Sequence, residues 1–216
     1  MFDLTLTFDN GPDPGVTPVV LDVLGRHGVS ATFFVLGRKL TAPAARVCAE
    51  RAHAEGHLIG NHTFNHGLPL GERPGWKAVR EEIERTQTEI GALTHDPPLF
   101  RPNGDGGNLD RRLLSEEAAV ALQAAGYSCV LWNAIPRDWA DPDGWVETAL
   151  QLVSERPWTL MVLHDIAGGA MDHLDRFLAE AAGRGGRFRQ DFPPSCVPIT
   201  AGRVTGPLAD FVTAPP

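Results

Sequence analysis

Short apolar runs alternate with longer segments of helical periodicity along most of the chain. The apolar runs are rich in β-branched and aromatic residues, as buried strands are, and they cover residues 4–8, 31–36, 57–61, 98–100, 128–132 and 159–163. Patterns with the 3.6-residue period of a helix lie between and after them, at about residues 17–28, 42–55, 75–93, 116–125, 143–155 and 171–184. This alternation indicates βα units built around a parallel sheet.

The longest helical segment, residues 75–93, has the clearest period. Its apolar residues recur on one stripe of a helix: Trp76, Val79, Ile83, Ile90 and Leu93. The whole pattern gives six or seven strand–helix pairs, which are compatible with a closed barrel and with an open doubly wound sheet. Residues 186–216 are rich in glycine and proline, so we expect a loop there, with room for one edge strand.

Polar residues of the kinds that catalyse reactions follow several of the predicted strands. In chain order they are Asp9 and Asn10 after the first strand, His62 and His66 after the third, Arg101 after the fourth, Asp138 and Trp139 beyond the fifth, and His164 after the last. The carboxyl ends of parallel strands share one face of a sheet or barrel, so we expect these side chains to converge there. Alternation along the first strand places Asp9 on the same side as Thr5 and Thr7, which points it into the mouth of a barrel, while Leu4, Leu6 and Phe8 meet helices.

The composition limits the function classes. Of the 216 residues, 43 % are hydrophobic and 21 % are charged, as in a folded globular protein, and we expect one domain over residues 1–216. The formal net charge of -8 argues against a nucleic-acid-binding surface. No run approaches the ~18 consecutive apolar residues of a membrane span, and the first residues lack the pattern of a leader peptide. We therefore expect a cytoplasmic protein without a membrane partner.

His62 and His66 are four positions apart. On a helical turn this spacing puts both imidazoles on one face, where they can bind a single divalent metal ion. Two surface histidines that bind nothing produce the same spacing more often. The spacing alone therefore leaves both interpretations open.

Five short motifs occur in order along the chain: TFDNGP at residues 7–12, HTFNH at 62–66, RPNG at 101–104, Asp138-Trp139 and Leu163-His164. Together they resemble the motifs of the NodB-like polysaccharide deacetylases, carbohydrate esterase family four, over about residues 4–163. The first two motifs match closely and the last three more loosely. The resemblance implies an α/β fold with a distorted (β/α) barrel of about seven strands. It also implies a hydrolase that removes N-acetyl groups from N-acetylglucosamine-type oligo- or polysaccharides.

The resemblance assigns an acid and a base. Asp9 would be the general base that takes a proton from the attacking water, and Arg101 would orient Asp9 and keep it ionised. His164 would be the general acid that protonates the leaving amine, with Asp138 as the partner that keeps His164 protonated.

The resemblance also assigns the walls of a small pocket. Trp139 and Leu163 would enclose the methyl group of the acetyl. Asn103 or Gly104 would offer a backbone N–H to the developing oxyanion. The glycines that follow fit a flexible turn equally well, so both interpretations of this segment stay open.

The implied metal site departs from the family at Asn10. A divalent metal, with zinc as the first choice, would be bound by His62, His66 and the residue at position 10, where the family has an aspartate. An amide oxygen can coordinate a metal but brings no negative charge, so the ion should be held less tightly. We adopt the interpretation in which Asn10 is a weak ligand of a working enzyme.

Two other interpretations of Asn10 stay open. In one, the site holds no metal, and the chain is either a metal-independent hydrolase of another small amide or a carbohydrate-binding relative without catalysis. In the other, the Asn10-Gly11 dipeptide, which is prone to deamidation, converts partly to aspartate after synthesis.

Overall fold

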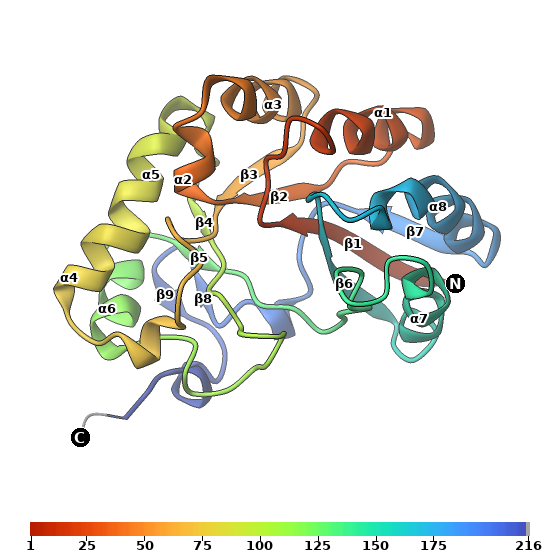
Figure 1. Ribbon diagram of the computed structural model, residues 1–216. Helices are drawn as coiled ribbons and strands as arrows, with labels where there is room; N and C mark the ends of the chain where they lie inside the picture. The colour runs from red at the N-terminus through yellow and green to blue at the C-terminus, as the bar shows by residue number, and fades with distance from the viewer. Residues whose placement is uncertain (215–216) are drawn as a thin grey trace.

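The computed structural model describes residues 1–214, which form a curled sheet with helices packed along its outer side (Figure 1). The strands within these residues are β1 Phe2–Asp9, β2 Thr32–Val35, β3 Leu58–Asn61, β4 Leu99–Phe100, β5 Ser128–Cys129, β6 Trp158–His164, β7 Gly186–Arg189, β8 Ile199–Thr200 and β9 Arg203–Val204. The α-helices are α1 Thr17–His27, α2 Gly37–Leu40, α3 Pro43–Ala54, α4 Trp76–Ala78, α5 Arg85–Ile90, α6 Glu116–Ala124, α7 Trp145–Leu152 and α8 Leu174–Gly183. The strand and helix alternation predicted from the sequence is confirmed.

The sheet curls into a distorted barrel. Its strand order is β6-β1-β2-β3-β4-β5-β8-β9, with β7 paired to β1. Strands β1 to β7 pair with one another in parallel, whereas β8 is antiparallel to both β5 and β9. The chain after β5 returns to β6 through one parallel bridge between Ala134 and Met161, which brings the two sides of the curled sheet together. The sequence left a barrel and an open sheet undecided, and this bridge places the molecule on the barrel side.

Residues 186–216 were expected to be a loop with at most one edge strand, and this was wrong. Strand β7 pairs with Phe2–Thr5 of β1, a stretch that β2 leaves free because β2 reaches only Thr7–Asp9. Strands β8 and β9 form an antiparallel pair that extends the sheet beyond β5. These strands are only two to four residues long and lie among glycines and prolines, so they lack a clear hydrophobic alternation.

The alternation predicted for β1 is confirmed. Leu4, Leu6 and Phe8 are fully buried in the core that lies between the sheet and helices such as α1 and α8. Thr5, Thr7 and Asp9 are also buried, but they occupy the other face, where Thr7 Oγ1 accepts a hydrogen bond of 2.6 Å from Arg101. Apolar packing on one face of β1 therefore fixes the direction of Asp9 on the other.

The helix expected over residues 75–93 is helical but irregular. It consists of α4, a π-helical turn at Val79–Glu84, α5 and a 3₁₀ turn at Gly91–Leu93. Four of its predicted apolar positions are buried, whereas Trp76 is 48 % exposed at the beginning of the segment. The wider π turn shifts the register of the buried stripe, and a hydrophobic period alone does not reveal such a shift.

None of the helices within residues 1–214 is both long enough and apolar enough to cross a lipid bilayer.

Candidate active site

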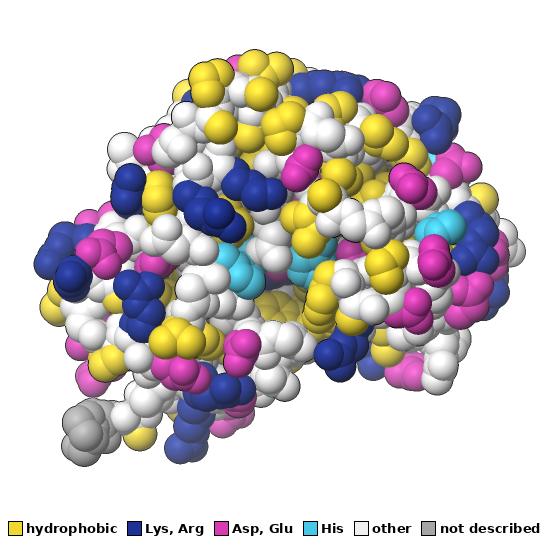
Figure 2. Space-filling model, in the orientation of Figure 1, with side chains coloured by type: hydrophobic (Ala, Val, Ile, Leu, Met, Phe, Trp, Pro, Cys, Tyr) yellow, Lys and Arg dark blue, Asp and Glu magenta, His cyan; other side chains and the backbone are white. Residues whose placement is uncertain are grey.

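A pocket of about 270 Å³ lies at the carboxyl ends of the parallel strands. Figure 2 shows histidine side chains at a hollow in the middle of one face of the molecule. Most of the site residues predicted from the sequence line this pocket: Asp9, Asn10, His62, His66, Asn103, Gly104, Trp139 and His164. The predicted convergence of strand ends is confirmed, because these side chains come from the ends of β1, β3, β4 and β6 and from the loop after β5.

Asp9 is held by a buried arginine behind the pocket. Nη1 of Arg101 lies 2.9 Å from Oδ1 of Asp9, and the exposed fractions of the two residues are 0 % and 4 %. Burial alone would raise the pKa of Asp9, but the charge and hydrogen bond of Arg101, together with His62 and His164, outweigh burial, so the pKa lies below its usual range. Asp9 is therefore ionised at neutral pH and can accept a proton.

Arg101 is itself fixed on all sides. Its guanidinium also donates to the carbonyl oxygens of Val130 and Leu131, each at 3.1 Å, and it lies 4.1 Å from the centre of the Phe34 ring. All three guanidinium nitrogens thus have defined hydrogen-bond acceptors, which orients the hydrogen bond to Asp9.

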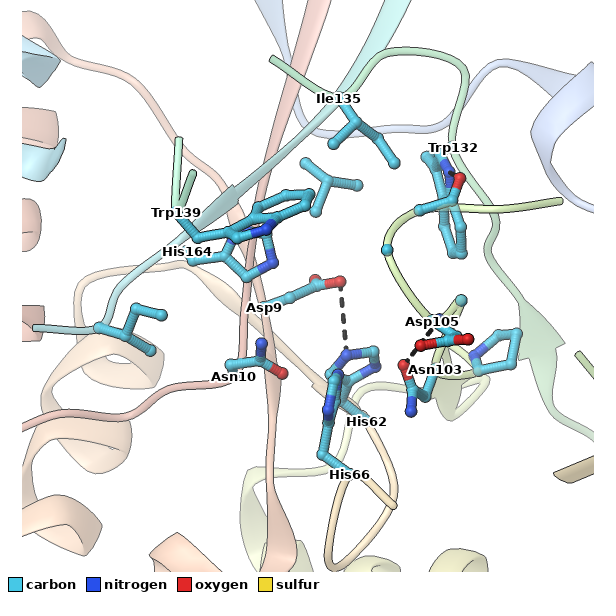
Figure 3. A pocket seen from close by; sticks show the side chains of 16 residues that line it. Asp9, Asn10, His62, His66, Asn103, Asp105, Trp132, Ile135, Trp139 and His164 are labelled. Carbon is cyan, nitrogen blue, oxygen red and sulfur yellow. Dashed lines mark hydrogen bonds and ion pairs between the residues drawn. The ribbon is translucent and has the colours of Figure 1, made fainter. Parts of the chain in front are cut away.

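His62 and His66 lie side by side beneath Asp9 (Figure 3), with ring centres 5.1 Å apart. The segment between them is a loop, because Thr63 and His66 have φ angles of 67° and 53°, so the helical turn assumed from their spacing was wrong. The side-by-side arrangement itself was predicted correctly. It arises from the loop rather than from helical periodicity.

The protonation of His62 is set by its neighbours. Its Nδ1 lies 2.9 Å from the carbonyl oxygen of Arg101, which can only accept, so Nδ1 carries the proton and Nε2 keeps a free lone pair. Nε2 lies 3.6 Å from Oδ2 of Asp9. Burial lowers the pKa of His62 to about 4 and also lowers that of His66, so both rings are neutral near pH 7.

His164 is paired with a second buried carboxylate. Nδ1 of His164 lies 2.9 Å from Oδ1 of Asp138, and its backbone N–H donates to Oδ2 at 2.8 Å. Burial favours the neutral imidazole, but the hydrogen bond and the charge of Asp138 outweigh burial and raise the pKa of His164. The indole of Trp139 meets the imidazole edge to face, with ring centres 4.7 Å apart.

Comparisons with known proteins identify the family of this chain. The family model described as polysaccharide deacetylase matches residues 3–125. The chain belongs to the polysaccharide deacetylase family. It is therefore a hydrolase that acts on amide bonds.

Individual relatives support the same placement. The chain is 36 % identical over 165 residues to a chitooligosaccharide deacetylase of Rhizobium leguminosarum bv. phaseoli, a match that covers 75 % of this chain and 67 % of the relative. It is 32 % identical over 194 residues to a peptidoglycan-N-acetylglucosamine deacetylase of Bacillus cereus, covering 86 % and 84 %. Among solved structures, a peptidoglycan deacetylase from Bacillus subtilis superposes with a TM-score of 0.70 at 28 % identity, covering 87 % of this chain and 86 % of that one. The expected family and its barrel fold are confirmed.

The apolar wall of the pocket differs from the prediction at Leu163. Leu163 is fully buried in the core between the sheet and the helices, so it does not line the pocket. Val162, on the opposite face of β6, lines the pocket together with Trp132, Ile135 and Trp139. The alternation rule used for β1 would have shown this, because Val162 has the same parity as His164.

Asn103 and Gly104 shape the rim of the pocket. The Asn103 side chain donates to the carbonyl oxygen of Gly67 and accepts from the backbone N–H of Asp105, so it ties two loops together. A Cβ atom on Gly104 would lie 2.5 Å from the Trp132 ring, so only glycine allows this close approach. The oxyanion role of these backbone amides stays a prediction.

Two further buried carboxylates near the pocket were missed. Asp165 directly follows His164 and accepts a hydrogen bond of 2.6 Å from Thr17 Oγ1, and burial raises its pKa to about 7. Glu82 lies in the π turn, and both of its oxygens accept hydrogen bonds, including two from the backbone between His62 and His66. The sequence contained a sign of each one, because Asp165 lies at a strand end and Glu82 is next to the buried stripe of its helix.

The donors available for a metal are two imidazoles and one amide. Within residues 1–214, no group of three or more His, Cys, Asp or Glu side chains is arranged to hold a metal ion. Asn10 is outside these residue types, and its Oδ1 is buried without a hydrogen-bond partner, which is unfavourable unless something else binds it. Two neutral imidazoles beside an unpartnered amide oxygen can bind a divalent cation. They bind it less tightly than a site with a carboxylate ligand would, because the amide brings no negative charge.

Proposed function

We propose that this chain hydrolyses the N-acetyl group of N-acetylglucosamine-type oligo- or polysaccharides, with a divalent metal held by His62, His66 and Asn10. The single observation that carries this proposal is that two ion pairs and two further imidazoles meet at one pocket. Asp9, tied to Arg101, and His164, tied to Asp138, both line the cavity that His62 and His66 also line. Figure 3 shows Asp9 between His164 and the two other imidazoles.

The two pairs divide the proton chemistry. Asp9, ionised beside Arg101, accepts the proton of the water that attacks the acetamide carbonyl. His164, protonated beside Asp138, donates a proton to the amine nitrogen as the C–N bond breaks. The products are acetate and a free amine, and the groups with opposite pKa shifts supply the base and the acid.

A bound metal would supply a Lewis acid that polarises the carbonyl oxygen and acidifies water. The protein contributes the neutral rings of His62 and His66 and the amide oxygen of Asn10. The hydrogen bond from Nδ1 of His62 to the carbonyl oxygen of Arg101 fixes the ring so that Nε2 is the nitrogen free to bind the metal.

The pocket walls suit a sugar with a small acyl group. Trp132, Ile135, Trp139 and Val162 provide apolar surface for the acetyl methyl and for one face of a sugar ring. The volume of about 270 Å³ is near the lower end of the roughly 300–1,000 Å³ that is typical of small-molecule pockets. This favours one sugar unit inside the pocket, with any further units of a chain outside it.

The test combines metal content with turnover. Protein purified without added metal or chelator is analysed for bound elements, and acetate release from N-acetylated chito-oligosaccharides is followed with and without added zinc. We expect zinc-dependent acetate release that is lost in Asp9→Asn. Acetate release that is independent of metal and survives thorough chelation would replace this proposal with a metal-independent amidase. Saccharide binding in calorimetry without any acetate would replace it with a carbohydrate-binding role.

A further inference from the structure

The loop between His62 and His66 holds an unfavourable backbone conformation. Thr63 and His66, neither of them glycine, have positive φ angles of 67° and 53°. Such residues cost free energy and persist only where the surrounding structure holds them. The contacts of this loop therefore determine how the two imidazoles are presented.

Glu82 makes most of the side-chain contacts that hold this loop. Its Oε2 accepts from the backbone N–H groups of Phe64 at 2.9 Å and Asn65 at 2.8 Å. Its Oε1 accepts from Nδ2 of Asn65 at 3.1 Å and from Nη1 of Arg73 at 2.6 Å. With only 2 % of its surface exposed, Glu82 is a buried carboxylate with both oxygens in use.

The π turn explains how Glu82 reaches the loop. A π turn widens the helix and leaves backbone groups free of the regular ladder. Nδ2 of Asn61 donates to the carbonyl oxygen of Ile83 at 2.9 Å, and Oδ1 of Asn61 accepts from the backbone N–H of Thr63 at 3.0 Å. The same turn, Val79–Glu84, thus holds the chain on both sides of Thr63, through Asn61 before it and through Glu82 after it.

We propose that Glu82, presented by this π turn, is a positioning residue that sets the separation and direction of the His62 and His66 imidazoles and thereby the affinity of the site for a divalent metal. The proposal rests on the metal site of the proposed function. Glu82 does not touch the pocket, so its effect passes through the backbone of Phe64 and Asn65. Contacts of this kind fix the orientation of metal ligands, and mutations that remove them commonly lower metal affinity 10- to 100-fold.

Glu81 provides a matched control. It lies in the same π turn and contacts the same arginine, with its Oε2 3.4 Å from Nη2 of Arg73. Its other ion pair, with Lys77, is exposed, and its hydrogen bonds do not include the His62–His66 loop among the described contacts. A change at Glu81 therefore alters charge on the turn without touching the loop.

The experiment measures cobalt binding and amide exchange on metal-free protein. The variants are Glu82→Met, which removes both acceptor oxygens at similar size, Glu82→Gln, which retains one, and the control Glu81→Met. We expect the Co²⁺ dissociation constant to rise about 10-fold or more in Glu82→Met, with a changed visible spectrum, and less in Glu82→Gln. Glu81→Met should stay within about twofold of the unaltered protein. Amides of residues 62–66 should exchange faster in both Glu82 variants before any metal is added.

The outcomes separate this proposal from the proposed function. Unaltered protein that takes up no cobalt would remove the metal from the proposed function, and amide exchange would then decide the positioning role alone. Unchanged amide exchange over residues 62–66 in Glu82→Gln overturns the positioning role. The role is also overturned if Glu81→Met lowers the cobalt affinity as much as Glu82→Met does. If Glu82→Met does not fold, Glu82→Gln carries the same comparisons.

Discussion

Nη1 of Arg101 donates a hydrogen bond of 2.9 Å to Oδ1 of Asp9 at the base of the pocket, and the same nitrogen donates to Thr7 Oγ1 at 2.6 Å. Both charged groups are buried, so each depends on the other for compensation. The pair also keeps Asp9 ionised. The same contact thus supports the fold and the proposed role of Asp9 as the base.

Arg101→Ala should lower the free energy of unfolding by about 3–5 kcal/mol at pH 7, because it leaves Asp9 buried without a countercharge. The folded-state pKa of Asp9 is lowered, so its favourable contribution is present above its ordinary pKa of 3.8 and disappears as the pH falls through the lowered value. Urea unfolding at pH 7 and in acid measures both effects. Arg187→Ala is the control, since Arg187 pairs with Asp3 at 2.6 Å on the surface, where solvent screens the pair, and its loss should be much smaller than that of Arg101→Ala. Equal losses in the two variants would contradict the assignment.

Asp138→Asn should lower the pKa of His164, because burial then acts against the imidazolium without the compensating carboxylate. The alkaline side of the pH profile of acetate release should move to lower pH, and kcat at pH 7 should fall at least about 10-fold, in keeping with the usual contribution of a general acid. The control is Asp143→Asn, since Asp143 forms an exposed pair with His173 at 3.4 Å. An unchanged pH profile in Asp138→Asn would exclude His164 as the acid.

Asn10→Asp should strengthen metal binding. The unpartnered Oδ1 of Asn10 is replaced by a carboxylate oxygen, which adds negative charge beside two neutral imidazoles, and aspartate tolerates the φ of 70° at this position. We expect the zinc dissociation constant to fall at least about tenfold, or about 1.4 kcal/mol. Competition with a chromophoric chelator measures it. Asn108→Asp controls for the added charge, since Asn108 directly follows the pocket residue Gly107 but does not itself line the pocket. A weaker or equal affinity in Asn10→Asp would show that position 10 is not a ligand.

The positions of the side chains proposed to be catalytic could be predicted because the ends of the strands could be predicted. Asp9 and His164 stand at the ends of apolar runs, and parallel strands bring such ends to one face. Asp138, the proposed partner of the acid, was found by its motif, although it lies in a loop nine residues beyond the end of β5 at Cys129. Alternation, applied to β6 as to β1, would also have placed Val162 rather than Leu163 in the pocket wall.

The parts that were not predictable depend on contacts between distant segments. Strand β7 pairs with the first half of β1, which β2 leaves unpaired. No local sequence pattern indicates that this part of β1 is available for pairing. The loop conformation at Thr63 and His66 depends on Glu82, about 18 residues later in the chain. Local propensity and period carry no information about such partners, so tertiary contacts decide these features.

Asp165 makes stability depend on pH in the opposite sense to Asp9. Its carboxylate is fully buried, accepts from Thr17 Oγ1 at 2.6 Å, and leaves Oδ1 without a partner, and burial raises its pKa to about 7 from 3.8. Between those two values the unfolded chain releases the proton that the folded chain retains. The contribution of Asp165 to stability therefore falls as the pH rises from about 4 to about 7 and is constant above that.

Asp165→Asn should therefore gain stability relative to the unaltered protein as the pH rises through this window, since the amide never ionises. At about 1.4 kcal/mol for each unit of pKa shift, the relative gain between pH 4 and pH 8 should be on the order of a few kcal/mol. Urea unfolding of both proteins at several pH values measures the difference, and Asp143→Asn, at an exposed carboxylate, should show almost none. A constant difference between Asp165→Asn and the unaltered protein over this range would mean that Asp165 is already ionised in the folded state at acidic pH.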